Sequence, residues 1–328
     1  MSITAVEKHL AGRKVLVTGA TGFIGSHLVG RLVSLGAQVT AVGPTLGWRP
    51  IVSSLVRQGR VRFVEVRAFW NPVSLQRVES EFKEVEYVVH LGYAMPCGKS
   101  SLENAVDDTR RNVLGTLGFV QRLPDSVSKI CFASSAMVYG LNPRRPVSET
   151  DCARPITTYA TGKLATETYL RLHAKESGVS LSILRYATVY GPMEAVPRAI
   201  PNFIRRVLAG RSPVIHGEGD DTRDYVHVLD VVHATLLALT RDAYAVQVYN
   251  VGTGRGYTTR EIAESIIRLA GKRVKPIHKP AKHVPNKVVC DISRARSVLG
   301  YEPRIELKEG LGDEIRYFID NPRFWRDL

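Results

Sequence analysis

The sequence predicts an α/β fold, a doubly wound parallel sheet with a smaller C-terminal region. Three observations support this fold class. Short β-branched runs alternate with helical stretches through the first half of the chain, a glycine-rich turn separates the first strand from the first helix, and the pattern becomes richer in proline after residue 192. Helices that connect parallel strands cover both faces of the sheet.

The predicted elements follow one another in regular order. Strands rich in Val, Ile and aromatic residues are expected at 14–19, 37–42, 61–66, 85–91, 129–135 and 180–186. Helices with apolar residues at helical spacing are expected between them, at 25–36, 73–82, 112–123 and 159–178. Beyond residue 192 the elements become shorter, which indicates a separate region laid over the carboxyl edge of the sheet.

The composition limits the classes of protein that fit. The 328 residues are 44% hydrophobic and carry a net charge of +14. Such a charge would suit nucleic acid or an anionic membrane, but the basic residues form no tail or block, so we expect a basic surface around a site for anionic ligands. No apolar run is long enough to span a membrane, and the four cysteines form no C-x-x-C pair, so a cytoplasmic protein is expected.

The turn after the first strand carries three glycines in the segment VTGATGFIGSHL. Residues without Cβ let backbone N–H groups approach a pyrophosphate, and the N-terminus of the following helix favours negative charge. A tight turn without a ligand is the alternative. We expect a dinucleotide site built from this turn and from the end of the 85–91 strand, with these residues against the cofactor: Gly19, Thr21, Gly22, Phe23, Ile24, Gly25 and Leu91.

Tyr159 and Lys163 lie one turn apart on the last of the predicted helices. At this spacing an ammonium can lie near the phenol and lower its pKa from about 10, which makes the phenolate available as a general base. The pair alone is weak evidence, because surface helices often carry Tyr and Lys at this spacing. Ser134 and Ser135 end the strand at 129–135, where a hydroxyl would reach the oxygen of a substrate.

Together these motifs resemble the extended short-chain dehydrogenase/reductase superfamily, and within it the NAD-dependent nucleotide-sugar epimerase/dehydratase family. The resemblance covers nearly the whole chain and rests on nine segments in register: TGATGFIGSHL, VVHLGYA, NVLGTLGFV, ASSAMVYG, YATGK, ILRYATVYGP, TRDYVHVLDVVHA, YNVGTG and RARSVLGYEP. It implies a Rossmann fold in which residues 1–188 and 224–253 bind the dinucleotide, while 189–223 and 254–328 bind the substrate.

The resemblance also implies roles for individual residues. Ser135, Tyr159 and Lys163 match the catalytic residues of the family, and Lys163 would also hold the cofactor ribose. Arg223 matches the residue that contacts the substrate diphosphate, and Thr188 stands where relatives carry Asn beside the substrate. The expected substrate contacts are therefore Ser134, Ser135, Thr188 and Arg223.

Partners follow from the same resemblance. A nucleotide-sugar is the expected substrate. The family dimerises by packing two helices from each subunit, which here are the apolar-striped segments 112–123 and 159–172, although these stripes could instead serve the core of one chain. Nucleic acid is not expected as a partner.

Two departures from the family narrow the reaction. Dehydratases place an Asp-Glu pair after the catalytic hydroxyl, and uronate decarboxylases keep a Glu there, but this chain has Ala136 and Met137. These side chains cannot transfer protons, so the chemistry that remains is oxidation of an alcohol and reduction of a ketone. In an epimerase, Tyr159 would take the proton of a sugar hydroxyl, most simply at C4, while hydride moves to the nicotinamide.

A third departure concerns the choice of cofactor. The family's ribose-binding acid would fall at Gly43, and no Asp or Glu occurs between Glu7 and Glu65. Without that acid a 2′-phosphate is not repelled, and Thr45, Arg49 and Arg67 stand near enough in sequence to contact it. We expect NAD or NADP as the cofactor, with tolerance of NADP. The alternative is that both arginines point to solvent.

Three functions remain open on the sequence. The leading one is a nucleotide-sugar epimerase acting at C4. An NADPH-dependent ketoreductase of a nucleotide-linked keto-sugar or another small ketone is the rival, because a net reductase exchanges its cofactor and NADPH is the usual donor. A dinucleotide-binding scaffold with a basic nucleic-acid-binding surface is the alternative from a different class, and the Ser-Tyr-Lys set argues against it.

Overall fold

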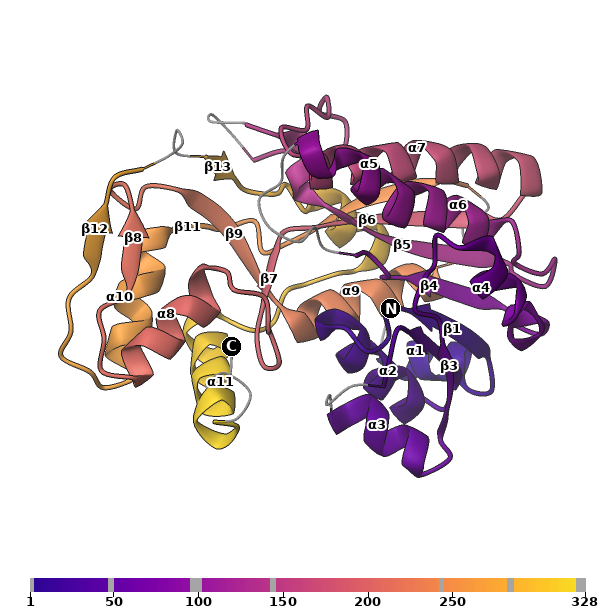
Figure 1. Cartoon of the computed structure of the whole chain (residues 1–328), viewed down its shortest axis with the longest axis horizontal. Helices are drawn as coiled ribbons and strands as arrows, with labels where there is room; N and C mark the ends of the chain where they lie inside the picture. The colour runs from indigo at the N-terminus through magenta and orange to yellow at the C-terminus, as the bar shows by residue number, and fades with distance from the viewer. Residues whose placement is uncertain are drawn as a thin grey trace.

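The computed structural model describes residues 3–46, 50–94, 102–141, 146–241, 245–281 and 286–322. Its centre is a seven-stranded sheet in which all neighbouring strands are parallel (Figure 1). In spatial order the strands are β10 (Gln247–Val251), β6 (Ser180–Tyr186), β5 (Lys129–Ser135), β4 (Tyr87–His90), β1 (Lys14–Thr18), β2 (Gln38–Gly43) and β3 (Val61–Glu65). The predicted fold class is confirmed, and the six predicted strands form within two residues of their expected ends.

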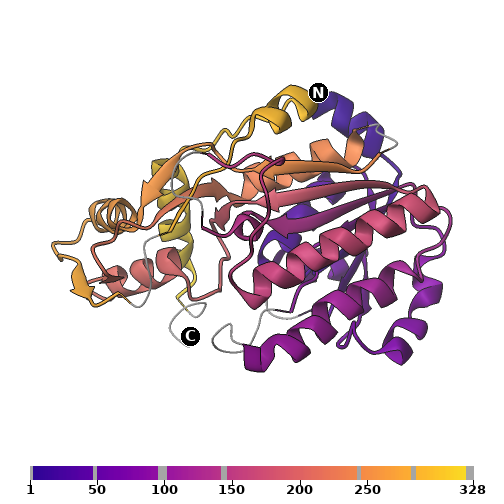
Figure 2. The same cartoon turned by 90° about the horizontal axis from the view of Figure 1, so that it is seen from above.

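Helices cover both faces of this sheet (Figure 2). On one face α2 packs against α9, with α1, α3 and the π-helical turn η5 beside them. Their bounds are Phe23–Ser34 (α2), Val228–Thr240 (α9), Ile3–Leu10 (α1), Pro50–Arg57 (α3) and Ala295–Leu299 (η5). The other face carries α4 (Pro72–Gln76), η1 (Glu79–Phe82), η2 (Leu102–Asn104), α5 (Ala105–Asp108), η3 (Thr109–Leu114), α6 (Gly115–Val120) and α7 (Thr158–Ser177). Because helices cover both faces of the sheet, every residue of β5 and β6 is buried.

The predicted helix at 73–82 is wrong in one respect. It is divided into α4 and η1, because Val78 leaves the helical region with φ −112° and ψ 2°. The break lets Leu75 and Phe82 both reach the same core, where Phe82 packs edge-on against Phe119 with ring centroids 5.9 Å apart. Tertiary packing outweighs helical periodicity in this segment.

The second lobe begins where β6 ends. β7 (Thr188–Tyr190) carries the chain out over the carboxyl edge of the sheet and pairs with β9 (Thr222–His227), which also pairs with β11 (Gly256–Thr258) and β13 (Lys287–Val288). A separate apolar core joins β7, β9 and β11 to the helices α8 (Ala199–Leu208), α10 (Thr259–Leu269) and α11 (Leu307–Asp320). Figure 1 shows this lobe beside the sheet, with the small ladder of β8 (Val214–His216) and β12 (Ile277–Lys279) at its far end.

Between these segments the chain returns to the central sheet through α9 and β10. Within the part of the chain that the structure describes, we find no helix with the length and apolar character that a membrane span requires. η4 (Ala136–Tyr139) follows β5 directly and places its first residues at the junction of the two lobes.

Candidate active site

A cavity of about 1290 Å³ lies between the carboxyl edge of the sheet and the second lobe. Its walls come from the glycine turn, from the ends of β4, β5 and β6, from α7, and from β7, α8 and β9. Ligands of open α/β sheets bind at this edge, and the volume exceeds that of a pocket for one small molecule. The cavity is large enough to take a dinucleotide and a second ligand together.

The glycine turn forms one end of the cavity. A Cβ on Gly19 would lie 2.8 Å from the backbone nitrogen of Gly92, and a Cβ on Gly25 would lie 2.1 Å from the carbonyl oxygen of Gly19. Gly22 caps α2 without a side chain, so the helix N-terminus faces the cavity uncovered. This cradle fits a pyrophosphate, because backbone donors and the helix dipole meet where no side chain intervenes. Gly19, Gly22, Phe23, Ile24, Gly25 and Leu91 line the cavity, whereas Thr21, the other residue predicted from this turn, is not among its lining residues.

Lys163 is 3% exposed, and its Nζ donates to the carbonyl oxygen of Ala133 at 2.6 Å. Burial lowers the pKa of this ammonium to about 7, while the carboxylates of Glu167 and Asp108 act in the opposite direction. The Nζ lies 5.9 Å from the centroid of the Tyr159 ring. The two side chains thus share one face of α7, as their spacing predicts.

Tyr159 is half-buried on the cavity wall. Burial raises the pKa of its phenol, whereas the positive charge of Arg198 and a hydrogen bond with Ser135 lower it. The direction is opposite to the one that the sequence predicts, because desolvation outweighs the nearby charges and the cation acting on the phenol is Arg198. Tyr159 therefore depends on Ser135 and Arg198 to become a base near neutral pH.

The two serines at the end of β5 have different partners. The Ser135 hydroxyl accepts a hydrogen bond from the backbone N–H of Met137 at 3.2 Å and is placed beside Tyr159. The Ser134 hydroxyl donates to the buried carboxylate of Glu167 at 2.5 Å. The Nε and Nη2 of Arg185 also bind Glu167, at 3.0 and 2.7 Å. Ser134 lines the cavity, but its hydroxyl is engaged in this buried network.

Arg223 and Thr188 lie on the wall formed by the second lobe. The Nη1 of Arg223 is 3.7 Å from the sulfur of Met137, so the thioether fills the place beside the guanidinium. The four predicted substrate contacts all line the cavity. Arg223 presents a fork of N–H groups that suits a diphosphate.

The described residues that we expected to set the preference between NAD and NADP do not lie together at one place. Arg67 is 79% exposed and pairs with Glu65, with Nε and Oε1 2.5 Å apart. Thr45 is exposed at the end of β2, and Arg49 lies outside the described residues. A Cβ on Gly43 would lie 2.7 Å from the Thr21 hydroxyl oxygen, so Thr21 takes the space that an acid at Gly43 would use.

Tyr93, Glu194 and Arg198 are among the residues lining this cavity that sequence reasoning missed. Arg198 precedes α8, and its Nη1 lies 4.0 Å from Oε1 of Glu194. Burial raises the pKa of Glu194 to about 8, against the effect of Arg198. Glu194 follows Met193, which adopts a positive φ of 74°, and such a non-glycine conformation is not visible in the sequence. Tyr93, within VVHLGYA, was visible as the bulky residue after a strand end.

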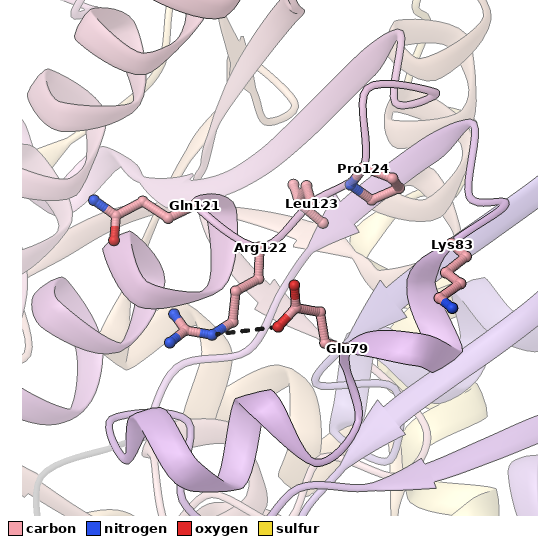
Figure 3. A pocket seen from close by; sticks show the side chains of 6 residues that line it. All are labelled: Glu79, Lys83, Gln121, Arg122, Leu123 and Pro124. Atoms are coloured by element: carbon pink, nitrogen blue, oxygen red, sulfur yellow. Dashed lines mark ion pairs between the residues drawn. The ribbon is translucent and has the colours of Figure 1, made fainter.

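A second depression of about 180 Å³ lies at the opposite edge of the sheet (Figure 3). It is lined by η1 and by the segment between α6 and β5, with Arg122 and Glu79 facing each other at 3.9 Å. These residues precede β4 and β5, so they lie at the amino ends of the strands. Among the described residues, no predicted site residue lines this depression, which is too small for a dinucleotide.

An enzyme that oxidises an alcohol with a bound dinucleotide is the class of protein that this fold and cavity define. The chain belongs to the NAD dependent epimerase/dehydratase family, whose model matches residues 15–252. The predicted family and the predicted enzyme class, a sugar-nucleotide epimerase or oxidoreductase that uses a nicotinamide dinucleotide, are thereby confirmed.

Individual relatives extend over almost the whole chain. A UDP-glucose 4-epimerase of Mycolicibacterium smegmatis is 34% identical over 312 residues, which is 93% of this chain and 98% of the relative. The crystal structure of UDP-glucose 4-epimerase with UDP-glucose from Thermotoga maritima is 34% identical, has a TM-score of 0.83, and matches 94% of this chain and 99% of that one. UDP-glucuronic acid 4-epimerase from Bacillus cereus in complex with NAD is 27% identical, with a TM-score of 0.81 and the same coverage.

Proposed function

We propose that this protein inverts the configuration at C4 of a UDP-linked sugar. The observation that carries the proposal is the presence of Ser135, Tyr159 and Lys163 in the same cavity as the glycine cradle for a dinucleotide. The side chains after the catalytic serine, Ala136 and Met137, leave no acid there for dehydration. The relatives named above are 4-epimerases of UDP-sugars, which supports both the nucleotide and the carbon atom.

Each residue of the set has a defined task. Tyr159 takes the proton of the C4 hydroxyl, and Ser135 holds that hydroxyl in line with the phenol. The positive charge of Arg198 favours the phenolate, and Lys163, whose Nζ donates to the carbonyl oxygen of Ala133, holds the ribose of the cofactor. NAD, when bound, supplies the acceptor and donor of hydride. Because the same phenol returns its proton after the keto-sugar has turned over, the reaction needs no net acid or base.

The arginines of the cavity exceed what a diphosphate requires. Arg223 is placed for the diphosphate, and Arg198, Arg205 and Arg206 line the same cavity. Arg198 is close enough to Tyr159 to lower the pKa of the phenol, so its guanidinium lies near the reacting sugar. We infer that the sugar carries a carboxylate, which would pair with Arg198. UDP-glucuronic acid is therefore the preferred substrate over UDP-glucose.

We propose NAD as the resident cofactor. An epimerase keeps its dinucleotide, since the hydride leaves and returns within one turnover. Arg67, which would have favoured NADP, is paired with Glu65. Residues 189–223 and 254–328 would bind the substrate, and 1–188 with 224–253 the cofactor. The free thiols of Cys131 and Cys290 are buried, which suits the cytoplasm.

We also propose that the enzyme is a homodimer. The side chains of Val106, Leu114, Tyr169 and Leu172 are apolar and exposed on α5, η3 and α7, which pack beside one another. Buried residues of α6 and α7, such as Phe119 and Leu170, already supply the core of the chain. An exposed apolar patch over two adjacent helices is typical of a subunit interface.

The test begins with the purified protein and no added dinucleotide. Released cofactor is identified by mass spectrometry, and C4 inversion of UDP-glucuronic acid and UDP-glucose is followed by NMR from both epimers. NAD at near one equivalent with inversion of either sugar supports the proposal, and faster inversion of the uronate supports the role of Arg198. An enzyme without bound NAD that oxidises NADPH only with a keto-sugar would establish the reductase instead.

Tyr159→Phe tests the assignment of the base. We expect kcat to fall by about 10³-fold or more, because proton transfer in the transition state is lost. Tyr169→Phe is the matched control, since Tyr169 lies on the same helix and is 45% exposed. Near-normal turnover of the Tyr159 variant would contradict the mechanism.

A further inference from the structure

Tyr93 is packed against both members of the catalytic pair. It follows β4, lines the cavity, and presents its ring face to Lys163, whose Nζ lies 4.2 Å from the ring centroid. The rings of Tyr93 and Tyr159 meet edge to face with centroids 5.0 Å apart. A π face at this distance favours an ammonium, most strongly where the ammonium is shielded from water.

Hydrogen bonds hold the hydroxyl of Tyr93. It donates to Oδ2 of Asp108 at 3.1 Å and lies 3.4 Å from the carbonyl oxygen of Tyr159. Asp108 is 5% exposed and also accepts from Nδ2 of Asn112 at 2.9 Å. The amide of Asn112 in turn binds both the N–H and the carbonyl of Ala94, the residue after Tyr93. The ring is therefore fixed at its hydroxyl and through the backbone.

Gly162 makes room for this arrangement. It lies inside α7, between Tyr159 and Lys163, where a glycine weakens the helix relative to alanine. A Cβ at this position would lie 2.7 Å from the Tyr93 hydroxyl oxygen and 3.2 Å from Oδ2 of Asp108. The glycine of the YATGK segment thus has a steric reason, which is the Tyr93 hydroxyl.

Several charged and titratable groups surround Lys163 in addition to the ring of Tyr93. The carboxylates are Glu167 on α7, which is shared with Arg185, and Asp108 on α5. His90 on β4 is buried and stays neutral, because burial and Lys163 lower its pKa to about 3. Two aromatic rings lie under the ammonium, that of Tyr93 with its centroid 4.2 Å from Nζ and that of Phe132 with its centroid 4.9 Å away.

We propose that Tyr93 is a positioning residue whose ring keeps the Lys163 ammonium charged and in place beside Tyr159, with Asp108 fixing its hydroxyl and Gly162 providing the space. The inference rests on the proposed function to the extent that Lys163 serves the reaction. The packing of Tyr93 against Lys163, Asp108 and Gly162 does not depend on which sugar is turned over.

The test compares Tyr93→Phe, which keeps the ring, with Tyr93→Leu, which removes it. The affinity of each purified enzyme for added NADH is measured by fluorescence between pH 6 and 10, after removal of any bound dinucleotide, together with kcat at each pH. Binding of this anionic probe should weaken as Lys163 loses its proton. We expect the weakening to begin about one pH unit lower in the Leu variant and at the wild-type pH in the Phe variant.

An unchanged binding profile in the Leu variant overturns the proposal, even if its kcat falls. Because NADH binding is measured without a sugar, failure of the epimerase assay in the wild type leaves this test intact. A merely structural role would lower the melting temperature of the Leu variant but would not move the pH at which binding weakens.

A second measurement tests whether Gly162 provides the space for the Tyr93 hydroxyl. We expect Gly162→Ala to lower the melting temperature, and Tyr93→Phe to restore it in the double variant, because the hydroxyl that the new Cβ would meet is gone. Gly312→Ala is the control, since Gly312 lies in α11 with no atom within 4 Å of a built Cβ. Equal losses from Gly162→Ala in both backgrounds would overturn the role given to Gly162.

Discussion

The Ser134 hydroxyl donates a 2.5 Å hydrogen bond to the Glu167 carboxylate, whereas the adjacent Ser135 faces Tyr159. Neighbouring residues of a strand point to opposite sides, so two serines that look alike in sequence act in different places. Glu167 also binds Arg185, which makes Ser134 part of the network that supports β5 and α7.

We therefore expect Ser135→Ala to impair catalysis and Ser134→Ala to impair the stability of the fold. Ser135→Ala should lower kcat by about 10²-fold or more, because the hydroxyl that orients the substrate is lost. Ser134→Ala should lower the free energy of unfolding by about 1–3 kcal/mol, since a buried carboxylate loses a donor, and should change kcat only a few-fold. Urea unfolding and steady-state kinetics of both variants check this, and a reversed pattern would contradict the placement.

Arg223 should contribute mainly to nucleotide binding. Replacing it with Leu removes charge-assisted hydrogen bonds, so we expect the Kd for UDP to rise by about 10–100-fold. Calorimetry with UDP measures this directly. Arg255→Leu is the control, because Arg255 is largely exposed and pairs with Glu306 outside the cavity lining. Equal effects from the two substitutions would show that general charge, not position, holds the nucleotide.

The buried pair of Glu194 and Glu314 should make stability depend on pH. Burial, together with mutual repulsion, raises the pKa of Glu314 well above its ordinary value, although its Oε2 accepts from the N–H of Gly191 at 2.9 Å. Burial raises the pKa of Glu194 to about 8. Above pH 4.5 the unfolded chain releases these protons while the folded chain retains them, so folding becomes less favourable as the pH rises toward 8.

Glu314→Gln should remove part of the stability loss that accompanies a rise in pH. We expect the variant and the wild type to have similar stability at pH 5, and the variant to be more stable at pH 8 by about 1 kcal/mol or more. Chemical unfolding at both pH values checks the prediction. Glu264→Gln, an exposed change on α10, should show no such difference. A difference in stability between the Glu314→Gln variant and the wild type that is the same at pH 5 and pH 8 would rule out titration of Glu314 as its cause.

Gly43 and Thr21 should control the choice between NAD and NADP together. An Asp at Gly43 would repel a 2′-phosphate, but its Cβ would meet the Thr21 hydroxyl. We expect Gly43→Asp combined with Thr21→Ala to shift the ratio of the two dissociation constants toward NAD by about tenfold or more. Titration of both dinucleotides measures the ratio, with Thr21→Ala alone as the control. No shift would mean that the ribose does not lie beside Gly43.

The apolar patch on α5 and α7 should hold two subunits together. Val106→Glu combined with Leu172→Glu places charges in the proposed interface, so we expect a monomer by light scattering with little change in the melting temperature of the chain itself. Ile319→Glu on α11 adds a charge at another exposed apolar site and should leave the mass unchanged. A wild type that is monomeric at all concentrations tested would contradict the dimer.

Much of the fold could be predicted from local sequence. β-branched runs alternating with helical periodicity placed six strands of the central sheet, because fully buried parallel strands have to be apolar. The helix at 73–82 could not be predicted to divide, since the break at Val78 serves the packing of Phe82 on Phe119.

The sequence by itself determined the glycine cradle and the pairing of Tyr159 with Lys163, because turn geometry and helical spacing are local properties. Only the tertiary structure decided that Ser134 belongs to the Glu167 network and that Arg198 lies near the Tyr159 phenol. These contacts join residues through folded geometry, and the electrostatics of a buried group depend on every neighbour that folding brings to it.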